Sequence, residues 1–182
     1  MKASIFIIAI FLSLTSFSQS SVSSSFDFRF GVGTSFIGSG DFVTYMIENE
    51  VGLNLNRYFA TSLSLGYGKS NYGGLDAVSF LQTNLNLFIS PFKNVKRNDF
   101  RVGLGIAHYK SDYYYRSSVW FIDGEIVDEE YTFESENAFG SSIVLENTYM
   151  ITSKMMIGVK LFSILHGDPT NSGVLVRVGM KL

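Results

Sequence analysis

Residues 100–107 read FRVGLGIA, a stretch in which every second side chain is large and apolar. A period of two residues indicates a β-strand, because successive side chains of a strand point to opposite faces of a sheet. The second face of this strand carries Arg101 and otherwise only glycine and alanine. Such a face gives little solubility in water, whereas its small side chains suit a cramped interior. The stretch therefore predicts a strand with its apolar face outside and its small face inside.

The same alternation recurs along the chain from Phe26 to the last residue. Seven further runs have it, at residues 26–36, 43–55, 59–67, 81–90, 139–149, 155–161 and 174–182. The run at 139–149 is irregular, since Ser141 and Asn147 sit on its apolar side. Most runs have about 9–14 residues, which is long for a soluble sheet and suits a strand that crosses a membrane at a tilt. Helical periodicity and a second domain are absent from the pattern.

The composition narrows the class of protein. The chain has 182 residues, of which 46% are apolar and 16% charged, with a formal net charge of −2. A typical soluble domain has about 25% charged residues. The apolar content excludes a disordered chain, and the small negative charge argues against a nucleic-acid partner. Because the chain has no cysteine, disulfides, thiolate zinc sites and cysteine nucleophiles are excluded.

A closed barrel satisfies these observations together. An apolar outward face belongs in lipid, and a closed barrel leaves no unpaired backbone edge there. We therefore predict an all-β fold, a closed antiparallel up-and-down barrel of eight transmembrane strands. The alternative is a secreted, soluble lipocalin-like carrier, in which the apolar face would line the interior.

The first segment has the order of an export signal. Lys2 precedes the apolar run IFIIAIFLSL, and small residues follow at Ser16 and Ser18. This order is typical of a secretory signal peptide. We predict a signal peptide at residues 1–19, a polar leader at 20–25 and a transmembrane β-barrel domain at 26–182.

Aromatic residues gather at both ends of the predicted strands. One band comprises Phe26, Tyr58, Phe59, Phe92, Phe100 and Tyr149, and the other Phe36, Tyr45, Tyr67, Tyr109 and Phe139. Two such bands are typical of the girdles that membrane barrels place at the two interfaces.

The connections differ between the two ends. The turns at Asn56-Arg57 and Thr152-Ser153 are tight, whereas the other end has a long connection at residues 110–137. Outer-membrane barrels have short periplasmic turns and longer outside loops. We therefore expect both termini in the periplasm and the 110–137 segment outside the cell.

These features together resemble the small outer-membrane β-barrel family, which includes the OmpA/OmpX-like and porin-family barrels of bacteria. The resemblance rests on the signal peptide, the eight alternating strands, NRYFATSLSLGYG at 56–68 and VLVRVGMKL at 174–182. It implies an integral protein of the bacterial outer membrane, with membrane lipid, lipopolysaccharide and the barrel-assembly machinery as partners. The chain departs from the family's usual aromatic last residue, since it ends in Leu182.

Several charged residues have inward parity, and the candidates for an ionic interior are Arg29, Glu48, Glu50, Arg101, Glu146, Lys160 and Arg177. Charges in a low-dielectric interior must be paired. Counting across the hairpins sets Arg29 opposite Glu50 and Glu146 opposite Lys160. We predict both pairs, with Arg177 nearby, as a polar plug, because an eight-stranded barrel is only wide enough for its own side chains. The alternative is a gated ion path.

The 110–137 segment is the most distinctive part of the chain. It holds eight of the 16 acidic residues and the candidate interaction residues Tyr113, Tyr114, Tyr115, Trp120, Phe121, Tyr131 and Phe133. The Asp123-Gly124 turn signal predicts that the strands continue above the membrane as a β-ribbon. Exposed aromatics anchor interfaces, so we predict contact with an extracellular protein or surface ligand. The alternative is a solvated loop whose acids face lipopolysaccharide or its divalent counter-ions.

Catalytic and metal chemistry find little support in the sequence. His108 and His166 are the only histidines. His108 has outward parity, so the alternative function is a barrel enzyme that modifies lipid A. A hydroxyl nucleophile must lie within hydrogen-bond reach of its base, and Ser111 points to the opposite face. We predict no enzyme, no catalytic residues, no cofactor and no metal site.

Overall fold

The computed structural model describes residues 25–38, 42–70, 76–92, 97–122, 125–167 and 170–182. The predicted signal peptide, the leader up to Ser24 and the Asp123-Gly124 turn lie outside the described residues. Among the described residues there is no helix long and apolar enough to cross a membrane.

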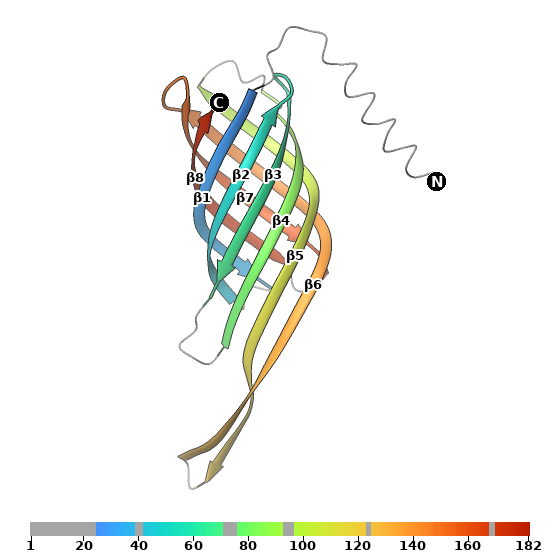
Figure 1. Cartoon of the computed structure of the whole chain (residues 1–182), viewed down its shortest axis with the longest axis vertical. Coiled ribbons are helices and arrows are strands. Elements are labelled where there is room, and N and C mark those ends of the chain that lie inside the picture. Colours follow the sequence, from blue (N-terminus) through green and yellow to red (C-terminus); the bar gives the residue numbers. More distant parts are fainter. Residues whose placement is uncertain (1–24, 39–41, 71–75, 93–96, 123–124, 168–169) are drawn as a thin grey trace, which may run out of the picture.

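Eight antiparallel strands close into a barrel, in which β8 returns to pair with β1 (Figure 1). The strands are β1 (Ser25–Ile37), β2 (Phe42–Asn54), β3 (Phe59–Lys69), β4 (Asp76–Ile89), β5 (Asn98–Ile122), β6 (Glu125–Met150), β7 (Met155–Leu165) and β8 (Asn171–Lys181). Each strand pairs with its neighbours in the sequence, so the predicted up-and-down order is confirmed. β1 begins at Ser25, one residue before the predicted start of the barrel.

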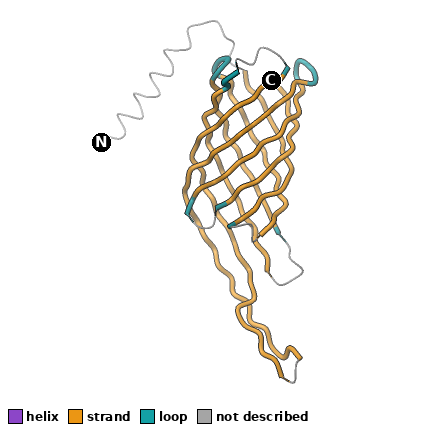
Figure 2. The backbone as a smooth tube through the Cα atoms, turned by 180° about the vertical axis from the view of Figure 1, so that it is seen from behind, coloured by secondary structure: helices purple, strands orange, loops and turns teal. Residues whose placement is uncertain are grey.

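The two short turns are built in the same way. In the β2–β3 turn, Asn56 Oδ1 accepts hydrogen bonds from the N–H groups two and three residues further on, at 2.8 and 2.9 Å. In the β6–β7 turn, Thr152 Oγ1 accepts the equivalent pair at 3.2 and 2.9 Å. A side chain that satisfies turn N–H groups lets the chain reverse within a few residues. Both turns lie at the end of the barrel where the chain ends, opposite the extended β5–β6 hairpin (Figure 2).

The distribution of side chains is the reverse of that in a soluble protein. Leu85, Leu104 and Val176 are 50%, 63% and 53% exposed on the outside of the barrel. Lys160 and Glu50, by contrast, are each 1% exposed, in the interior. The soluble lipocalin-like alternative is therefore wrong, because it would turn the three apolar side chains toward the barrel axis.

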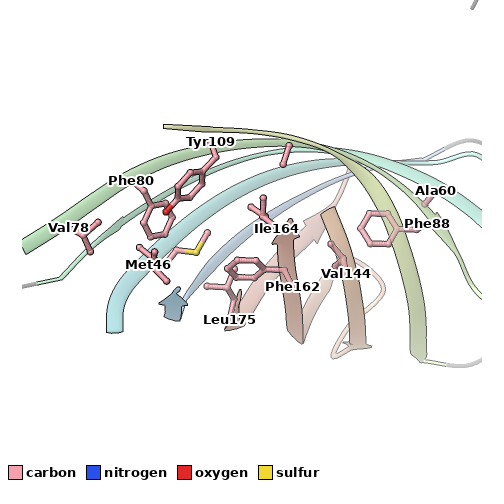
Figure 3. Close-up of a cluster of buried hydrophobic side chains, with 12 residues drawn as sticks. Met46, Ala60, Val78, Phe80, Phe88, Tyr109, Val144, Phe162, Ile164 and Leu175 are labelled. Atoms are coloured by element: carbon pink, nitrogen blue, oxygen red, sulfur yellow. The ribbon is translucent and has the colours of Figure 1, made fainter. Parts of the chain in front are cut away.

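A buried apolar cluster fills part of the interior (Figure 3). It includes Ile37, Met46, Val78, Phe80, Phe88, Tyr109, Phe162, Ile164 and Leu175. The inward face is therefore less uniformly small than its glycines predicted. Gly68 and Gly103 leave room for the rings of Phe80 and Phe88, since a Cβ at either glycine would overlap the ring. The small residues thus accommodate large ones that point inward from the neighbouring strand.

Tyr109 was predicted in the outer aromatic band, and this prediction is wrong. Its side chain is buried in the interior, where the ring stacks on Phe80 at 5.3 Å and on His166 at 4.4 Å between centroids. Odd-numbered residues in this part of β5 face inward, so strand parity outweighs position at the strand end. The other residues of that band are exposed, namely Phe36, Tyr45, Tyr67 and Phe139.

Two strands extend far beyond the barrel. β5 has 25 residues and β6 has 26, whereas β4, the longest of the others, has 14. Residues 110–122 of β5 and 125–137 of β6 form a twisted two-stranded ribbon that extends from the barrel. We call it the β5–β6 ribbon (Figure 1). Register shifts between Arg116 and Ser118 and between Trp120 and Phe121 mark β-bulges in it. The predicted continuation of the strands at residues 110–137 is confirmed.

Candidate functional site: an interior ionic cluster and an exposed ribbon

The strand register places the charged interior residues as counted from the sequence. Arg29 on β1 lies opposite Glu50 on β2, and Glu146 on β6 lies opposite Lys160 on β7. All four side chains point into the barrel, because they share the parity of the buried positions. The two register predictions are confirmed.

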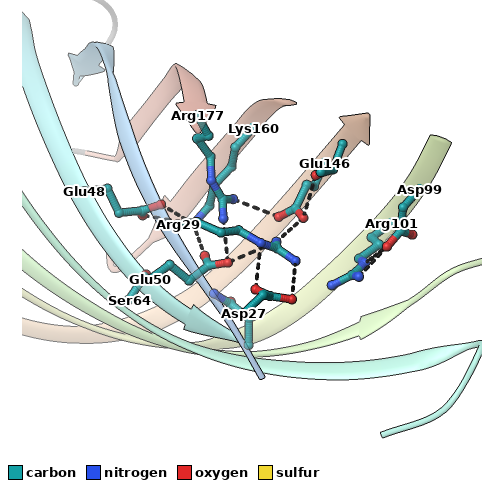
Figure 4. Close-up of polar contacts among 12 residues, drawn as sticks. Asp27, Arg29, Glu48, Glu50, Ser64, Asp99, Arg101, Glu146, Lys160 and Arg177 are labelled. Carbon is teal, nitrogen blue, oxygen red and sulfur yellow. Dashed lines mark hydrogen bonds and ion pairs between the residues drawn. The ribbon is translucent and has the colours of Figure 1, made fainter. Parts of the chain in front are cut away.

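Glu50 lies at the centre of the interior ionic cluster (Figure 4). Its carboxylate accepts hydrogen bonds from Lys160 Nζ at 2.9 Å, Arg177 Nη2 at 2.7 Å and Arg29 Nη1 at 3.3 Å. Glu146 accepts from Arg177 Nη1 at 2.8 Å and also from Arg29. The guanidinium groups thus bridge carboxylates from β2 and β6, which are not adjacent in the sheet.

The predicted ion pair between Glu146 and Lys160 is wrong, although the two residues are opposite in register. Lys160 Nζ instead donates to both oxygens of Glu48, at 2.7 and 2.9 Å, as well as to Glu50. Lysine has a long stem and the barrel is narrow, so its ammonium reaches β2 across the lumen. The strand register determines where a side chain leaves the backbone, but it does not determine which partner the terminal group of a long side chain binds.

Two interior residues depart from the predicted set. Asp27 was not predicted, yet it binds Arg29 through two contacts of 2.8 and 3.0 Å. Its inward parity, two positions before Arg29, was the signal that could have found it. Arg101 lies apart from the cluster, where it binds Asp99 and donates to Asn54 Oδ1 at 2.8 Å. The structure therefore brings six of the seven predicted residues together and adds Asp27.

A cavity of about 270 Å³ lies between this cluster and the short turns. Its lining includes Asp27, Arg29, Asp99, Arg101 and Lys181. The interior thus holds an ionic cluster and a polar cavity in addition to the apolar cluster.

The aromatic residues of the ribbon divide between its two faces. Tyr114 stacks on Tyr131 with centroids 4.9 Å apart and planes within 4°, and it lies opposite Phe133 in register. Tyr115 is on the other face, where its hydroxyl donates to Glu134 Oε1 at 2.9 Å. Tyr113 packs edge-on against Phe42 at 6.0 Å, at the mouth of the barrel. Trp120 is exposed near the tip, and the side chain of Phe121 lies outside the described residues.

Hydrogen bonds tie the two strands of the ribbon together. Glu129 accepts from the Tyr131 hydroxyl at 2.6 Å and from Arg116 Nη1 at 3.1 Å. The hydrogen bond from Tyr131, followed by the charge and hydrogen bond of Arg116, lowers the pKa of Glu129 below its ordinary value of 4.5. The same hydrogen bond raises the pKa of Tyr131, because the neutral phenol is the donor. The acid of this contact is therefore ionised and the phenol neutral at neutral pH.

The two histidines lie apart from one another. His108 Nε2 is 2.7 Å from Asn137 Oδ1, and its ring lies 4.8 Å from that of Phe139. His166 stacks on Tyr109 inside the barrel mouth. No group of three His, Asp or Glu side chains suited to a metal ion occurs among the described residues.

The fold is similar to that of solved outer-membrane proteins. Ail, the attachment invasion locus protein of Yersinia pestis, matches with a TM-score of 0.62 and 10% identity, over 88% of this chain and 100% of Ail. A second structure of Ail, in complex with the heparin analogue sucrose octasulfate, matches with a TM-score of 0.60 and 11% identity over the same shares. OprG from Pseudomonas aeruginosa matches with a TM-score of 0.60 and 12% identity, over 88% of this chain and 96% of OprG.

At the level of sequence, neither a known family model nor a curated protein matches the chain. The likeness in structure covers 88% of the chain, and the proteins that show it are small barrels of the outer membrane. The chain therefore has the fold of the small eight-stranded outer-membrane β-barrels, the family that its sequence resembles.

Proposed function

We propose that this protein is an integral barrel of the bacterial outer membrane that acts through its surface, without enzymatic activity. Its termini lie in the periplasm, its lumen is filled rather than open, and the β5–β6 ribbon projects from the cell to bind an extracellular partner. Membrane lipid and lipopolysaccharide surround the barrel, and the barrel-assembly machinery inserts it.

The observation that carries the proposal is the inverted placement of apolar and charged side chains. Apolar residues are exposed along all eight strands, whereas the charges of the barrel interior are nearly fully buried. A soluble monomer rarely exposes contiguous apolar surface of more than a few hundred Å². Lipid accepts such a surface, and the closed sheet leaves no backbone edge within it.

The ribbon supports the surface role because it extends beyond what is needed to span a membrane. A transmembrane strand needs about 9–11 residues, and β5 and β6 have 25 and 26. The described part of the ribbon exposes Tyr114, Trp120 and Phe133. Aromatic side chains of this kind are enriched at the centres of protein interfaces. Ail binds a heparin analogue, but the acids of this ribbon make a polyanion an unsuitable partner here.

The lipid-modifying alternative at His108 lacks a comparable observation. Among the described residues, the contacts of its ring are Asn137 and Phe139. Neither supplies a nucleophile or an acid.

Surface labelling tests location and orientation together. Because the chain has no cysteine, Ser117→Cys and Ser153→Cys each introduce a single thiol. Both serines are exposed, the first on the ribbon and the second in the β6–β7 turn. A maleimide that cannot cross membranes is expected to label Ser117→Cys on intact cells. It should label Ser153→Cys only after the outer membrane is permeabilised.

Equal labelling of the two variants on intact cells would contradict the proposed orientation. If Ser117→Cys also stays unlabelled before permeabilisation, the result would contradict display of the ribbon at the cell surface. Denatured protein, in which both thiols react, controls for the intrinsic reactivity of each position.

The filled lumen predicts a low conductance. In planar lipid bilayers, we expect the wild-type protein to form no large, steady channels, because side chains of the apolar and ionic clusters occupy the interior. A sixteen-stranded porin, measured in the same bilayers, shows that channels are detectable. Large and steady channels from this protein would overturn the filled-lumen proposal.

A further inference from the structure

The outer edge of β6 lacks a partner strand along the ribbon. β7 pairs with β6 from Met150 to Ser141, and no described strand pairs with that edge beyond Ser141. On the other side of the ribbon, β4 covers β5 as far as Tyr115. The long free edge therefore belongs to β6 (Figure 1).

Alternate residues of β6 turn their backbone polar groups toward this edge. The Met150 N–H donates to the Arg97 carbonyl on the β5 side at 2.7 Å, and the Ile151 N–H donates to the Met155 carbonyl on the β7 side at 2.9 Å. This direction alternates along an antiparallel strand. The N–H and carbonyl groups of odd-numbered β6 residues therefore point toward the β7 side. Along residues 131–137 this side is the free edge.

The side chains beside this edge also alternate in character. Glu130, Glu134 and Glu136 are exposed on the face that continues from the barrel interior. Tyr131 and Phe133 are on the face that continues from the barrel exterior, and Phe133 is 65% exposed. One face next to the free edge is thus acidic and the other aromatic.

We propose that the free edge of β6 at residues 131–137 binds an extended segment of another protein that alternates basic and apolar side chains. This rests on the surface role proposed above and specifies the chemistry of the partner. An added strand would pair with the free N–H and carbonyl groups. Because paired strands place side chains on common faces, its lysines or arginines lie beside Glu134 and Glu136 and its apolar residues beside Phe133.

Charge distinguishes this partner from two others. A second copy of the chain, paired along the same edge, would set glutamates beside glutamates, and like charges across a strand pair are unfavourable. A polyanionic glycan would meet the same carboxylates. A basic strand pairs with the free backbone N–H and carbonyl groups, and its positive side chains lie beside the glutamates of the acidic face.

Two synthetic peptides test the backbone pairing. The first is a ten-residue peptide that alternates lysine and valine, titrated against the full protein in nanodiscs of zwitterionic lipid. The second has the same sequence with N-methyl groups on four consecutive central residues, which removes N–H donors on both of its edges. We expect the first peptide to bind and the second to bind at least tenfold more weakly. Equal binding would overturn the proposal, because charge alone would then account for it.

Two double variants with the same change in charge test the acidic face. Glu134→Gln with Glu136→Gln removes the acids beside the proposed strand, and we expect binding of the lysine-valine peptide to weaken about two- to thirty-fold. Asp112→Asn with Asp128→Asn removes one acid from the opposite face of the ribbon and one acid nearer its tip, outside residues 131–137, and we expect less than a twofold effect. Equal weakening by the two pairs would contradict the assigned face.

Ser135→Pro tests the edge itself. Residue 135 turns its N–H to the free edge, so proline removes one ladder donor there and leaves the backbone bonds to β5 in place. Proline also removes the hydrogen bond from Ser135 Oγ to Asp112 Oδ1 on β5, a loss that Ser135→Ala shares. We expect at least tenfold weaker binding of the lysine-valine peptide, with no change for Ser135→Ala. Heat-modifiable migration on gels shows whether each variant retains the barrel.

Labelling of Ser117→Cys on intact cells separates the two proposals. A labelled ribbon with no peptide binding would refute the partner edge and leave the surface role in place. An unlabelled ribbon would refute the surface role, whatever the peptide does in nanodiscs.

Discussion

Replacing Lys160 by methionine is expected to lower the free energy of unfolding by about 3–5 kcal/mol. Lys160 donates three hydrogen bonds, two to Glu48 and one to Glu50, and its side chain is 1% exposed. Methionine preserves most of the length and removes the charge. Glu48 would then lose its direct ion pair, since among the described residues Lys160 is the cation that contacts it. An uncompensated buried carboxylate is the reason for the size of the effect.

The expected loss is measured by urea unfolding of the protein in lipid vesicles, followed by circular dichroism. Lys154→Met is the matched control, because Lys154 is exposed in the β6–β7 turn and should change stability by less than about 0.5 kcal/mol. Adding Glu48→Gln to Lys160→Met should recover part of the loss, since it removes the unpaired charge. Equal stability of the two lysine variants would contradict the structural role of the ionic cluster.

Leu85→Arg is expected to destabilise the barrel in a bilayer by about 2–4 kcal/mol. Leu85 is on the outer surface of β4, midway along the barrel, and lies opposite Leu63 on β3 and Ile106 on β5. A guanidinium there would enter the hydrocarbon region, where its loss of hydration is largest. The same unfolding experiment in vesicles measures the effect.

Ile89→Arg is the matched control for depth. Leu85 and Ile89 are both 50% exposed on the same face of β4, but Ile89 lies at the end of the strand, opposite Phe59. Near the interface the arginine should cost only about 0–1 kcal/mol, because it can reach the headgroups. If Leu85→Arg and Ile89→Arg both change the free energy of unfolding by the same small amount, this surface does not contact lipid. In water the position of the arginine along the strand would make no difference.

Tyr109 and Lys160 show where sequence reasoning succeeded and where it failed. Strand parity correctly placed Lys160 inside the barrel and would have placed Tyr109 there as well. The error at Tyr109 came from giving its position at the strand end more weight than its parity. The error at Lys160 was of another kind. Its register position opposite Glu146 was predicted correctly, but its ion-pair partner is Glu48 and not Glu146. Parity is local, whereas the end of a long side chain can meet any strand across a narrow lumen.

The ribbon shows the same division. Its existence followed from the Asp123-Gly124 turn signal and the apolar runs that flank it. Its free edge did not, because that depends on where β7 leaves β6 and on how far β4 follows β5. Nor did the separation of Tyr114 from Tyr115 onto different faces enter the prediction of a single interaction surface.

The amino-acid sequence alone determined the number of strands, the side of the sheet to which each residue points and the inversion of apolar and charged faces. These properties follow from the two-residue repeat of an extended backbone, which neighbouring residues set among themselves. Only the tertiary structure decided which buried charges meet and which strand edge stays unpaired. Those outcomes depend on how the sheet closes on itself, because closure brings residues from distant strands within reach and ends the pairing of each strand at its own point.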